Sequence, residues 1–403
     1  MSLNDYILQD KIGSGAFGKV YRVKYKQDNK ICAAKISIYS INETTEELFQ
    51  NLSREVNIIS KLNHPSIIKF ILYSPLNFKL KPKPVIITEY ASNGSLSQLI
   101  EHDKSTTGQH RLNDTMMLKI IYGIASAMSY LHSHNILHRD LKPDNVLLDN
   151  YLFPKVGDFG LSKSDSTNYQ QNILHSTGNG NIKGTPAFIS PEIWSDGKYS
   201  KSSDVYAFSI VVYEIMTCEK AFPNANFYSL IAGVIKRNRP EFNVFVPDAY
   251  KYLIIRCWSH DPEERPTFDE ILNELKTNKE YITDNVDEKE FFEYVNFIEN
   301  YKISFDSDNF VIPFISAKDY HIYNNSKKNN QFKKITDFLY LKALEFPFEY
   351  FEIISEKSAE IVKKAISGDA DMQLEVGRNL IEGRYDFPFD VQTGICFLIG
   401  SIN

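Results

Sequence analysis

Two short polar segments carry the side chains with the most evident chemistry. Residues 138–145 read HRDLKPDN, and residues 158–160 read DFG after a short apolar run. Asp140 could accept the proton of an alcohol, and Lys142 could neutralise charge on a phosphoryl group. The side-chain oxygens of Asn145 and Asp158 could hold divalent cations. The spacing of these residues predicts a site for phosphoryl transfer.

The two segments resemble the catalytic and metal-binding loops of eukaryotic protein kinases. The position of Lys142 resembles the serine/threonine-directed members of the family rather than the tyrosine-directed ones. The resemblance implies transfer of the γ-phosphoryl group of ATP, with Mg²⁺ as cofactor, to serine and threonine hydroxyls of protein substrates. It also implies that Arg139 pairs with a phosphate on the polar segment after Asp158, where Ser176 and Thr177 are candidate acceptors.

A glycine-rich turn joins two strand-like runs near the N-terminus. The runs are residues 6–12 and 19–25, and the turn contains Gly13, Gly15 and Gly18. Glycine lets a main chain approach phosphates closely, because it has no Cβ. An ordinary hairpin turn would also explain these glycines. The order strand, glycines, strand nevertheless fits the kinase flap better than the strand-to-helix dinucleotide motif.

The next apolar strand, residues 31–36, contains Lys35. A buried charge is costly unless it is satisfied, so Lys35 predicts an anionic partner. The following helix is expected to begin at Thr44, which has capping-box spacing with Glu47, and it carries Glu55. The resemblance implies an ion pair between Lys35 and Glu55. A solvated helix charge is the alternative interpretation of Glu55.

Two further strand-like runs, residues 67–73 and 85–91, flank a proline-bearing loop that is not expected to form a strand. In kinases the second run ends at the hinge between the lobes. The resemblance implies that Thr88 controls access to a back pocket and that the main chain of Glu89 and Ala91 binds the adenine edge. It also implies apolar contacts to the nucleotide from Ile12, Val20, Ala33 and Leu147. Each of these apolar residues could instead be plain core.

Residues further along the chain match the larger lobe of a kinase. Glu192 closes residues 184–192 (GTPAFISPE), and the resemblance implies a buried ion pair between Glu192 and Arg265. Thr185 would contact the catalytic aspartate, and Asp204 would brace the catalytic-loop backbone. A metal site built on the nearby histidines, His132, His134 and His138, is disfavoured because His138 already belongs to the loop motif.

The predicted fold is α+β, with the two lobes of a protein kinase: a small antiparallel sheet lobe with one helix, and a larger helical lobe. The resemblance covers residues 6–276. Thr267 and Glu270 have capping-box spacing for the last helix of this domain, which should end near Lys276. Residues 257–267 (CWSHDPEERPT) resemble the tyrosine-kinase-like group.

The composition changes after this domain. Residues 277–365 are interpreted as a linker or extension of unknown fold that is partly helical. Residues 366–403 contain two amphipathic helical patterns and resemble one Sel-one-like helical repeat. The repeat could be a lone docking element for a protein partner, the start of a longer array, or a hairpin packed on the kinase domain.

Composition and charge disfavour several protein classes. The chain has 403 residues, a net charge of -6 and a pI near 5.9, which gives no general attraction to nucleic acid or anionic membrane. No stretch is apolar for long enough to cross a bilayer. The four cysteines lie far apart in apolar contexts, which predicts buried thiols and a reducing, cytoplasmic location: Cys32, Cys218, Cys257 and Cys396.

Two other classes of function stay open on the sequence alone. The first is a catalytically silent nucleotide-binding scaffold, and the second is a helical adaptor that carries a regulatory kinase domain. Silent relatives usually lose the lysine, the base or a metal ligand. The first class is therefore disfavoured, because all of these residues are present: Lys35, Asp140, Asn145 and Asp158.

Overall fold

A computed structural model describes residues 3–15, 18–40, 52, 55–56, 58–74, 76–81, 83–105, 111–164, 186–223, 225–301, 361–362, 364–365 and 369–382. These fall into two compact units. The sheet unit comprises Met1–Lys61, Lys69–Tyr90 and Ser304–Asn403, and the helical unit comprises Leu62–Ile68 and Ala91–Ile303. Several expectations lie outside the described residues: those on Thr44, Glu47, Ser176, Thr177, Thr185, Cys396 and the second helix of the C-terminal hairpin.

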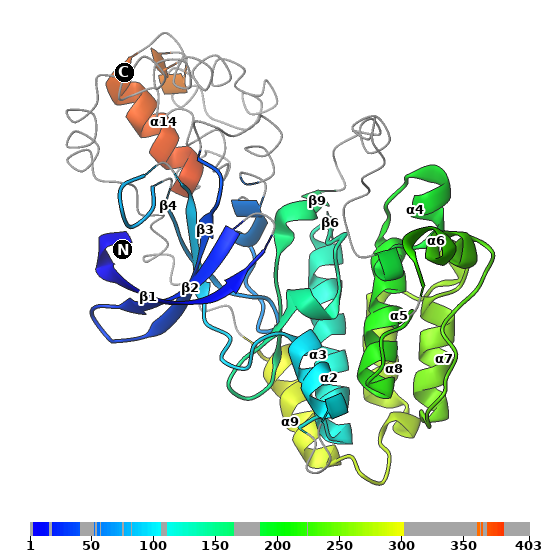
Figure 1. Ribbon diagram of the computed structural model, residues 1–403. Helices are drawn as coiled ribbons and strands as arrows, with labels where there is room; N and C mark the ends of the chain where they lie inside the picture. The colour runs from blue at the N-terminus through cyan, green and yellow to red at the C-terminus, as the bar shows by residue number, and fades with distance from the viewer. Residues whose placement is uncertain are drawn as a thin grey trace. The chain divides into compact units, whose positions relative to one another are not determined.

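The sheet unit is built on one antiparallel sheet (Figure 1). Its strand order is β1-β2-β3-β5-β4. The strands are β1 (Tyr6–Ser14), β2 (Gly18–Tyr25), β3 (Ile31–Ser37), β4 (Phe70–Ser74) and β5 (Val85–Glu89). The proline-bearing loop before β5 contains no described strand, in agreement with the expectation.

Side chains alternate between the two faces of this sheet, as strand geometry requires. Cys32 and Ala34 of β3 belong to the buried cluster of the unit, together with Val23 of β2 and Ile87 of β5. Lys35 of β3 therefore points to the opposite face. Residues 55, 56, 58 and 59 are helical.

The C-terminal part of the sheet unit contains α14 (Ala370–Glu382). This helix coincides with the first helix of the predicted C-terminal hairpin. Asp369 Oδ1 accepts a hydrogen bond from Met372 N, which caps the start of the helix. The resemblance to a Sel-one-like repeat stays a prediction.

The helical unit consists mainly of α-helices (Figure 1). The helices are α2 (Leu96–Ser105), α3 (Asp114–Ser133), α4 (Pro191–Asp196), α5 (Lys201–Thr217), α6 (Phe227–Ile235), α7 (Asp248–Cys257), α8 (Phe268–Thr277) and α9 (Glu288–Glu299). The central helix α3 packs on α5, α8 and α9, and α5 also packs on α7. Asn113 caps α3, because its side chain accepts a hydrogen bond from Met116 N.

Helix α5 is almost wholly buried, as its apolar composition predicts. Its N-cap is Ser200, which forms a capping box with Ser203 at the first turn. The predicted capping box of Thr267 and Glu270 is confirmed at the start of α8. That helix ends at Thr277, close to the expected position.

Two short two-stranded sheets of the helical unit carry the polar segments. One pairs β6 (Ile136–Leu137) with β9 (Lys163–Ser164), and the other, the β7–β8 hairpin, pairs β7 (Val146–Leu148) with β8 (Pro154–Val156). In the β7–β8 hairpin Val146 lies opposite Val156.

The cysteines of the described chain are free thiols. Cys32 and Cys257 are buried, as predicted, whereas Cys218 is only partly buried. Among the described residues, no helix is both long enough and apolar enough to span a bilayer.

Candidate active site

The catalytic-loop aspartate is oriented by its own loop. Asp140 follows β6 and precedes a 3-10 turn at Pro143–Asn145. Lys142 Nζ lies 2.8 Å from Asp140 Oδ2 and 3.0 Å from Oδ1. Asn145 Nδ2 donates to Asp140 Oδ2 at 2.8 Å and to the Asp140 carbonyl at 2.7 Å. The Asp140 carboxylate is thus held by two neighbours while 14% of its side-chain surface remains exposed.

Asp204 fixes the backbone of this loop from α5. Its carboxylate accepts hydrogen bonds from His138 N and Arg139 N, both at 2.9 Å, and lies 2.9 Å from His132 Nε2. Arg139 has a φ of 68°, a left-handed conformation that a non-glycine residue adopts only when its surroundings impose it. The predicted bracing role of Asp204 is confirmed by these bonds.

The charge of Asp204 is stabilised despite its burial. Burial alone would raise the pKa of the Asp204 carboxyl, but hydrogen bonding to His132 and to the loop backbone holds that pKa below its ordinary value. Sequence reasoning considered His132 only as a metal ligand, and the contact with Asp204 depends on a packing between α3 and α5 that no local pattern shows.

The Arg139 side chain is partly buried and packs on an aromatic ring. Its guanidinium carbon lies 4.8 Å from the centroid of the Tyr199 ring, within the range of a cation–π contact. The expected phosphate partner of Arg139 belongs to residues 165–185, which lie outside the described residues. Tyr199 has no motif signal in the sequence and was missed there.

The hairpin of β7 and β8 brings the two candidate metal ligands together. Asn145 directly precedes β7, and Asp158 follows β8 after Gly157. Gly157 N donates to the Asn145 carbonyl at 2.9 Å, which ties the two ends of the hairpin. Asp158 has φ 60° and ψ 72°, so the chain turns sharply there into a 3-10 turn at Phe159–Leu161.

His138 connects the catalytic loop with the segment around Asp158. Its Nε2 lies 3.1 Å from the Gly157 carbonyl, and its ring lies 5.4 Å from the fully buried Phe159 ring. Ser162 Oγ donates to the His138 carbonyl at 3.0 Å. Sequence reasoning named no role for Ser162, because this contact depends on the pairing of β6 with β9.

The donor set suits Mg²⁺ bound together with a phosphate ligand. Mg²⁺ prefers six oxygen ligands and usually takes only one or two from carboxylates, with water and phosphate supplying the others. Asn145 uses both N–H groups on Asp140, which leaves its amide oxygen for a cation. Asp158, at the other end of the β7–β8 hairpin, would supply a carboxylate. In the described part of the chain no group of three or more His, Cys, Asp or Glu residues could hold a metal ion by itself.

The predicted ion pair of the sheet unit is confirmed. Lys35 Nζ lies 2.6 Å from Glu55 Oε1, and the Glu55 residue is 8% exposed. The solvated alternative for Glu55 is therefore wrong. The pair holds the lysine ammonium on the face of the sheet opposite the buried cluster.

Strand register places several predicted nucleotide contacts on this same face. Val20 lies opposite Lys35 and Gly13 lies opposite Val20 in the antiparallel pairs. Ala33 lies opposite Thr88. Val20, Ala33 and Thr88 are all only partly buried, so this face is not closed by the core of the unit. Ile12 of β1 is 41% exposed.

The glycines of the turn have different structural reasons. A Cβ on Gly18 would lie 2.9 Å from the Ile36 carbonyl, so close strand packing requires glycine there. A Cβ on Gly15 would meet no described atom within 4 Å, so packing among the described residues gives no reason for that glycine. Gly13 would meet only Val20, at 3.6 Å. Open space at Gly15 fits a main chain that approaches a ligand.

The predicted hinge residues have main-chain contacts of their own. Glu89 N donates to the Lys69 carbonyl at 2.9 Å, and the Glu89 carbonyl accepts a hydrogen bond from Thr88 Oγ1 at 3.1 Å. The adenine contact of Glu89 stays a prediction. Ala91 and Leu147 belong to the helical unit. Their contacts with a nucleotide stay predictions.

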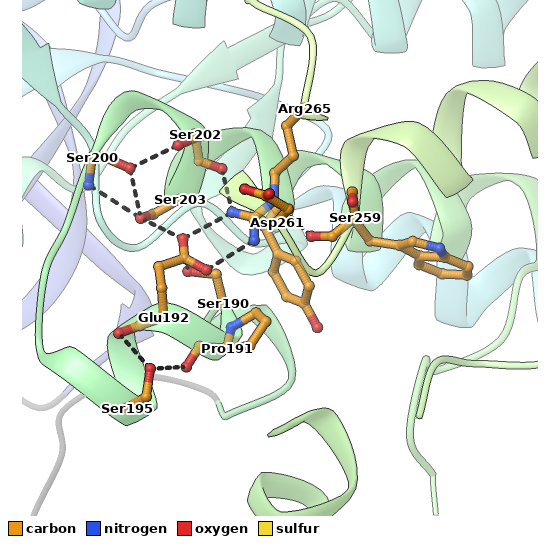
Figure 2. Close-up of polar contacts among 12 residues, drawn as sticks. Ser190, Pro191, Glu192, Ser195, Ser200, Ser202, Ser203, Ser259, Asp261 and Arg265 are labelled. Atoms are coloured by element: carbon orange, nitrogen blue, oxygen red, sulfur yellow. Dashed lines mark hydrogen bonds and ion pairs between the residues drawn. The ribbon is translucent and has the colours of Figure 1, made fainter. Parts of the chain in front are cut away.

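Glu192 and Arg265 form the predicted buried ion pair (Figure 2). The guanidinium binds both carboxylate oxygens, with NH1–Oε1 and NH2–Oε2 distances of 2.8 Å. Ser190 and Ser203 hydroxyls also donate to Oε1, at 2.6 and 3.0 Å. Arg265 completes its bonding with the carbonyls of Ser259 and Ser202.

The environment of this pair favours its charged form. Burial alone would raise the pKa of the Glu192 carboxyl, but hydrogen bonding and charge from Arg265 hold that pKa below its ordinary value. Bidentate pairs between arginine and carboxylate are the strongest of the common charge-assisted contacts. The pair anchors α4 and the start of α5 to the turn after α7.

Comparison with known proteins agrees with this geometry. A family model described as "Protein tyrosine and serine/threonine kinase" matches residues 6–275. A probable serine/threonine-protein kinase of Dictyostelium discoideum is 33% identical over 280 residues, which cover 68% of this chain and 20% of the relative. The serine/threonine-protein kinase CTR1 of Arabidopsis thaliana is 31% identical over 277 residues, 68% of this chain and 31% of the relative.

A relative of more similar length also matches. The serine/threonine/tyrosine-protein kinase HT1 of Arabidopsis thaliana is 32% identical over 286 residues, 70% of this chain and 69% of the relative. By contrast, the match spans less than a third of the Dictyostelium relative and of CTR1. The predicted α+β kinase fold is confirmed, and ATP with Mg²⁺ is the standard cofactor pair of such proteins. The chain belongs to the protein tyrosine and serine/threonine kinase family.

Proposed function

We propose that the chain is an ATP- and Mg²⁺-dependent protein kinase that phosphorylates serine and threonine hydroxyls of protein substrates in intracellular signalling. The observation that carries the proposal is the catalytic loop itself. Asp140 is oriented by Lys142 and Asn145 within 3.0 Å, and the same Asn145 is tied by its carbonyl to the residue before Asp158. A base and two oxygen donors for a cation are thus assembled in one unit.

Each residue of the loop has a defined chemical role. When bound, Mg²⁺-ATP supplies the phosphoryl group and neutralises charge on its oxygens. The Asp140 carboxylate accepts the proton of the substrate hydroxyl and holds that hydroxyl in line for attack. Lys142 keeps Asp140 oriented and offers its remaining N–H to the negative charge that develops on the phosphoryl oxygens. Asn145 and Asp158 would hold the cation.

The sheet unit carries residues that would contact the nucleotide. Lys35, held by Glu55, offers its ammonium to phosphate oxygens, and the turn at Gly15 has open space for close main-chain approach. Ile12, Val20 and Ala33 offer partly exposed apolar surface for the base. The catalytically silent alternative has less support, because Lys35 is held by Glu55 and Asp140 is held by Lys142 and Asn145.

A transfer assay tests the proposal. The full chain would be incubated with γ-labelled ATP, Mg²⁺ and a serine/threonine/tyrosine peptide array, beside a Lys35→Met variant as a control that keeps a similar side-chain volume. We expect label on the peptides with wild type and a loss of at least about 100-fold with Lys35→Met. No transfer by a folded, ATP-binding wild type would support the silent scaffold instead.

The choice of hydroxyl is a separate part of the proposal. Lys142 resembles the serine/threonine-directed members of the family, whereas the printed name of HT1 includes tyrosine. Phosphoamino acid analysis of the labelled peptides separates the two. Phosphoserine and phosphothreonine are expected, and phosphotyrosine as the main product would overturn this assignment.

We also propose that residues 366–403 bind a protein partner and that the chain works in the cytoplasm. Gln373 Nε2 donates to the Ala365 carbonyl at 2.9 Å, which ties α14 to the helical residues before it. Buried free thiols at Cys32 and Cys257 support a reducing compartment.

A deletion of residues 366–403 tests the partner proposal. We expect the shortened chain to phosphorylate an array peptide at the wild-type rate and to lose a cross-linked partner that the full chain retains. Retention of every cross-link would contradict the partner proposal, and a fluorescent fusion would test the location.

A further inference from the structure

The family match ends at residue 275, but the ordered helical unit does not. Helix α9 begins at Glu288, with Asp287 as its N-cap. Its buried residues are spaced as one face of a helix: Phe291, Tyr294, Val295 and Ile298. Asp287 N donates to Thr115 Oγ1 at 2.8 Å, which fixes the start of α9 on α3.

A buried lysine of α3 depends on α9 for its partner. The Lys119 side chain is 5% exposed, and its Nζ lies 2.8 Å from Glu290 Oε1. The same ammonium lies 4.7 Å from the centroid of the Phe153 ring and 5.6 Å from that of Tyr294. Burying a lysine is unfavourable without a counter-charge, and α9 supplies both the carboxylate and one ring. Helix α9 thus provides the counter-charge that the buried lysine of α3 requires.

The contact continues from α3 to the strand that leads to Asp158. A Cβ on Gly123 would overlap Tyr294 Oη and lie 2.5 Å from Pro154 Cγ, so only glycine lets these three elements meet. The Tyr294 ring lies 4.5 Å from that of Phe153, directly before β8. Tyr294 therefore packs at the root of β8.

Tyr294 also reaches the segment that pairs with β8 on its other side. Its Oη lies 3.5 Å from Ser66 Oγ in the buried interior. Val156 N donates to the Ser66 carbonyl at 2.8 Å, and Ile68 N donates to the Val156 carbonyl at 2.9 Å. One aromatic side chain thus supports both the start of β8 and the segment that holds its end.

We propose that Tyr294 of α9 is a positioning residue for the metal-binding end of the active site. It acts through β8 and Ser66 on Asp158, and it contacts neither substrate nor cation. The inference rests on the proposed function only in taking Asp158 as a ligand of Mg²⁺. Under this proposal, helix α9 contributes to the function of the active site.

The test compares two substitutions of the same kind in the full chain. Tyr294→Leu removes the ring that packs on Phe153 and the hydroxyl near Ser66. Tyr250→Leu removes another buried ring of the helical unit, on α7, which contacts Tyr281 instead of β8. Both variants should lose stability, so both would be studied where circular dichroism shows them to be folded.

Two readouts that need no phosphoryl transfer decide the outcome. In Tyr294→Leu we expect amide hydrogen exchange at residues 154–158 to rise about fivefold or more, and in Tyr250→Leu to stay near wild type. The Mg²⁺ concentration that gives half of the ADP-induced thermal shift should rise about threefold in Tyr294→Leu alone. Equal exchange and equal Mg²⁺ dependence in the two variants would overturn the proposal.

If Tyr294→Leu does not fold, two milder substitutions provide the test. Tyr294→Phe and Ser66→Ala each remove one hydroxyl, and their effects on exchange at residues 154–158 should be non-additive. Additive effects would contradict a coupling through Ser66. If the variants show these effects while the wild type binds ADP but transfers no phosphate, the proposed function is refuted and the positioning role remains.

Discussion

Two of the carboxylate–cation pairs of the helical unit, Asp140 with Lys142 and Glu192 with Arg265, differ in the cation rather than in the carboxylate. The Asp140 and Glu192 side chains are both 14% exposed. Arg265 is completely buried and also binds two main-chain carbonyls, whereas Lys142 is 17% exposed and, among the described residues, donates only to Asp140. A pair with a saturated cation stabilises the fold, and a pair with spare donors can still bind a ligand.

The span of chain that each pair bridges differs as well. Lys142 lies two residues from Asp140, whereas Arg265 lies 73 residues from Glu192. The local pair can form in any state that keeps the loop, while the distant pair requires the folded unit. Substitutions in the first pair should therefore change activity, and substitutions in the second should change stability.

The largest expected effect separates the two carboxylates. Asp140→Asn keeps the side-chain shape but removes the base, so the transfer rate should fall about 10³-fold. ADP binding and the melting temperature should stay close to wild type. The matched Glu192→Gln variant should lose stability and keep the rate per folded molecule. Comparable rates for Asp140→Asn and wild type would refute the role of Asp140.

The next test removes the arginine of the buried pair between Glu192 and Arg265. Arg265→Leu leaves Glu192 without its partner, which should lower the free energy of unfolding by about 3 kcal/mol. Urea unfolding followed by circular dichroism measures the change. Lys142→Leu is the control, and it should lose activity with a much smaller loss of stability. Equal destabilisation by the two variants would contradict the view that one pair serves activity and the other serves stability.

Lowering the pH separates the contributions that individual side chains make to the stability of the helical unit. Burial lowers the pKa of His64 to about 4, and the positive charge of Lys155 contributes to the same shift. The neutral ring accepts a hydrogen bond from Ser66 N at Nδ1. The unfolded ring takes up a proton near pH 6.5. The stability that His64 provides is therefore complete above pH 6.5 and is lost as the pH falls from 6.5 to about 4.

Glu192 acts in a more acidic range. Its folded pKa is lowered, so its contribution is present above the ordinary glutamate value of 4.5 and is lost as the pH falls through the folded pKa. Melting temperatures between pH 7 and pH 5 should fall in wild type and fall less in His64→Gln. An unchanged slope in His64→Gln would contradict a buried neutral ring. Arg265→Leu should flatten only the range below pH 4.5.

The smallest effect concerns a single hydroxyl of the buried pair. Ser190→Ala removes a 2.6 Å hydrogen bond to Glu192 Oε1, while Arg265 and Ser203 still bind that oxygen. The free energy of unfolding should fall by about 1 kcal/mol or less. Thermal melts would measure it, with Ser195→Ala as a control, because Ser195 contacts only main-chain carbonyls at 3.4 Å. A loss as large as that of Arg265→Leu would mean that Ser190 is essential to the pair.

The sequence predicted an anionic partner for Lys35, because a charge in an apolar strand requires one. The resemblance to kinases then named Glu55 as the partner of Lys35 and Arg265 as the partner of Glu192, and both ion pairs are confirmed. The capping box of Thr267 and Glu270 likewise predicted the start of α8, because it depends on residues three positions apart. At the start of α5, several neighbouring serines did not single out Ser200 as the cap.

Contacts that depend on packing between distant helices could not be predicted in this way. Lys119 appeared in the sequence as one polar residue of a long helix, and its burial became evident only with Glu290 of α9 beside it. His132 was weighed as a metal ligand, although its partner is the carboxylate of Asp204. Neither residue carries a local pattern that names its partner.

The residue at position 123 limits which residues can occur in a distant part of the chain, at position 294. Position 123 can gain a side chain only if both the phenol at position 294 and the ring of Pro154 move away. Related kinases that lack both the tyrosine and the proline should therefore tolerate alanine at this place in α3, whereas those that keep either should not. A methyl group at this position would mark the branches of the family that lack this contact with the added helix.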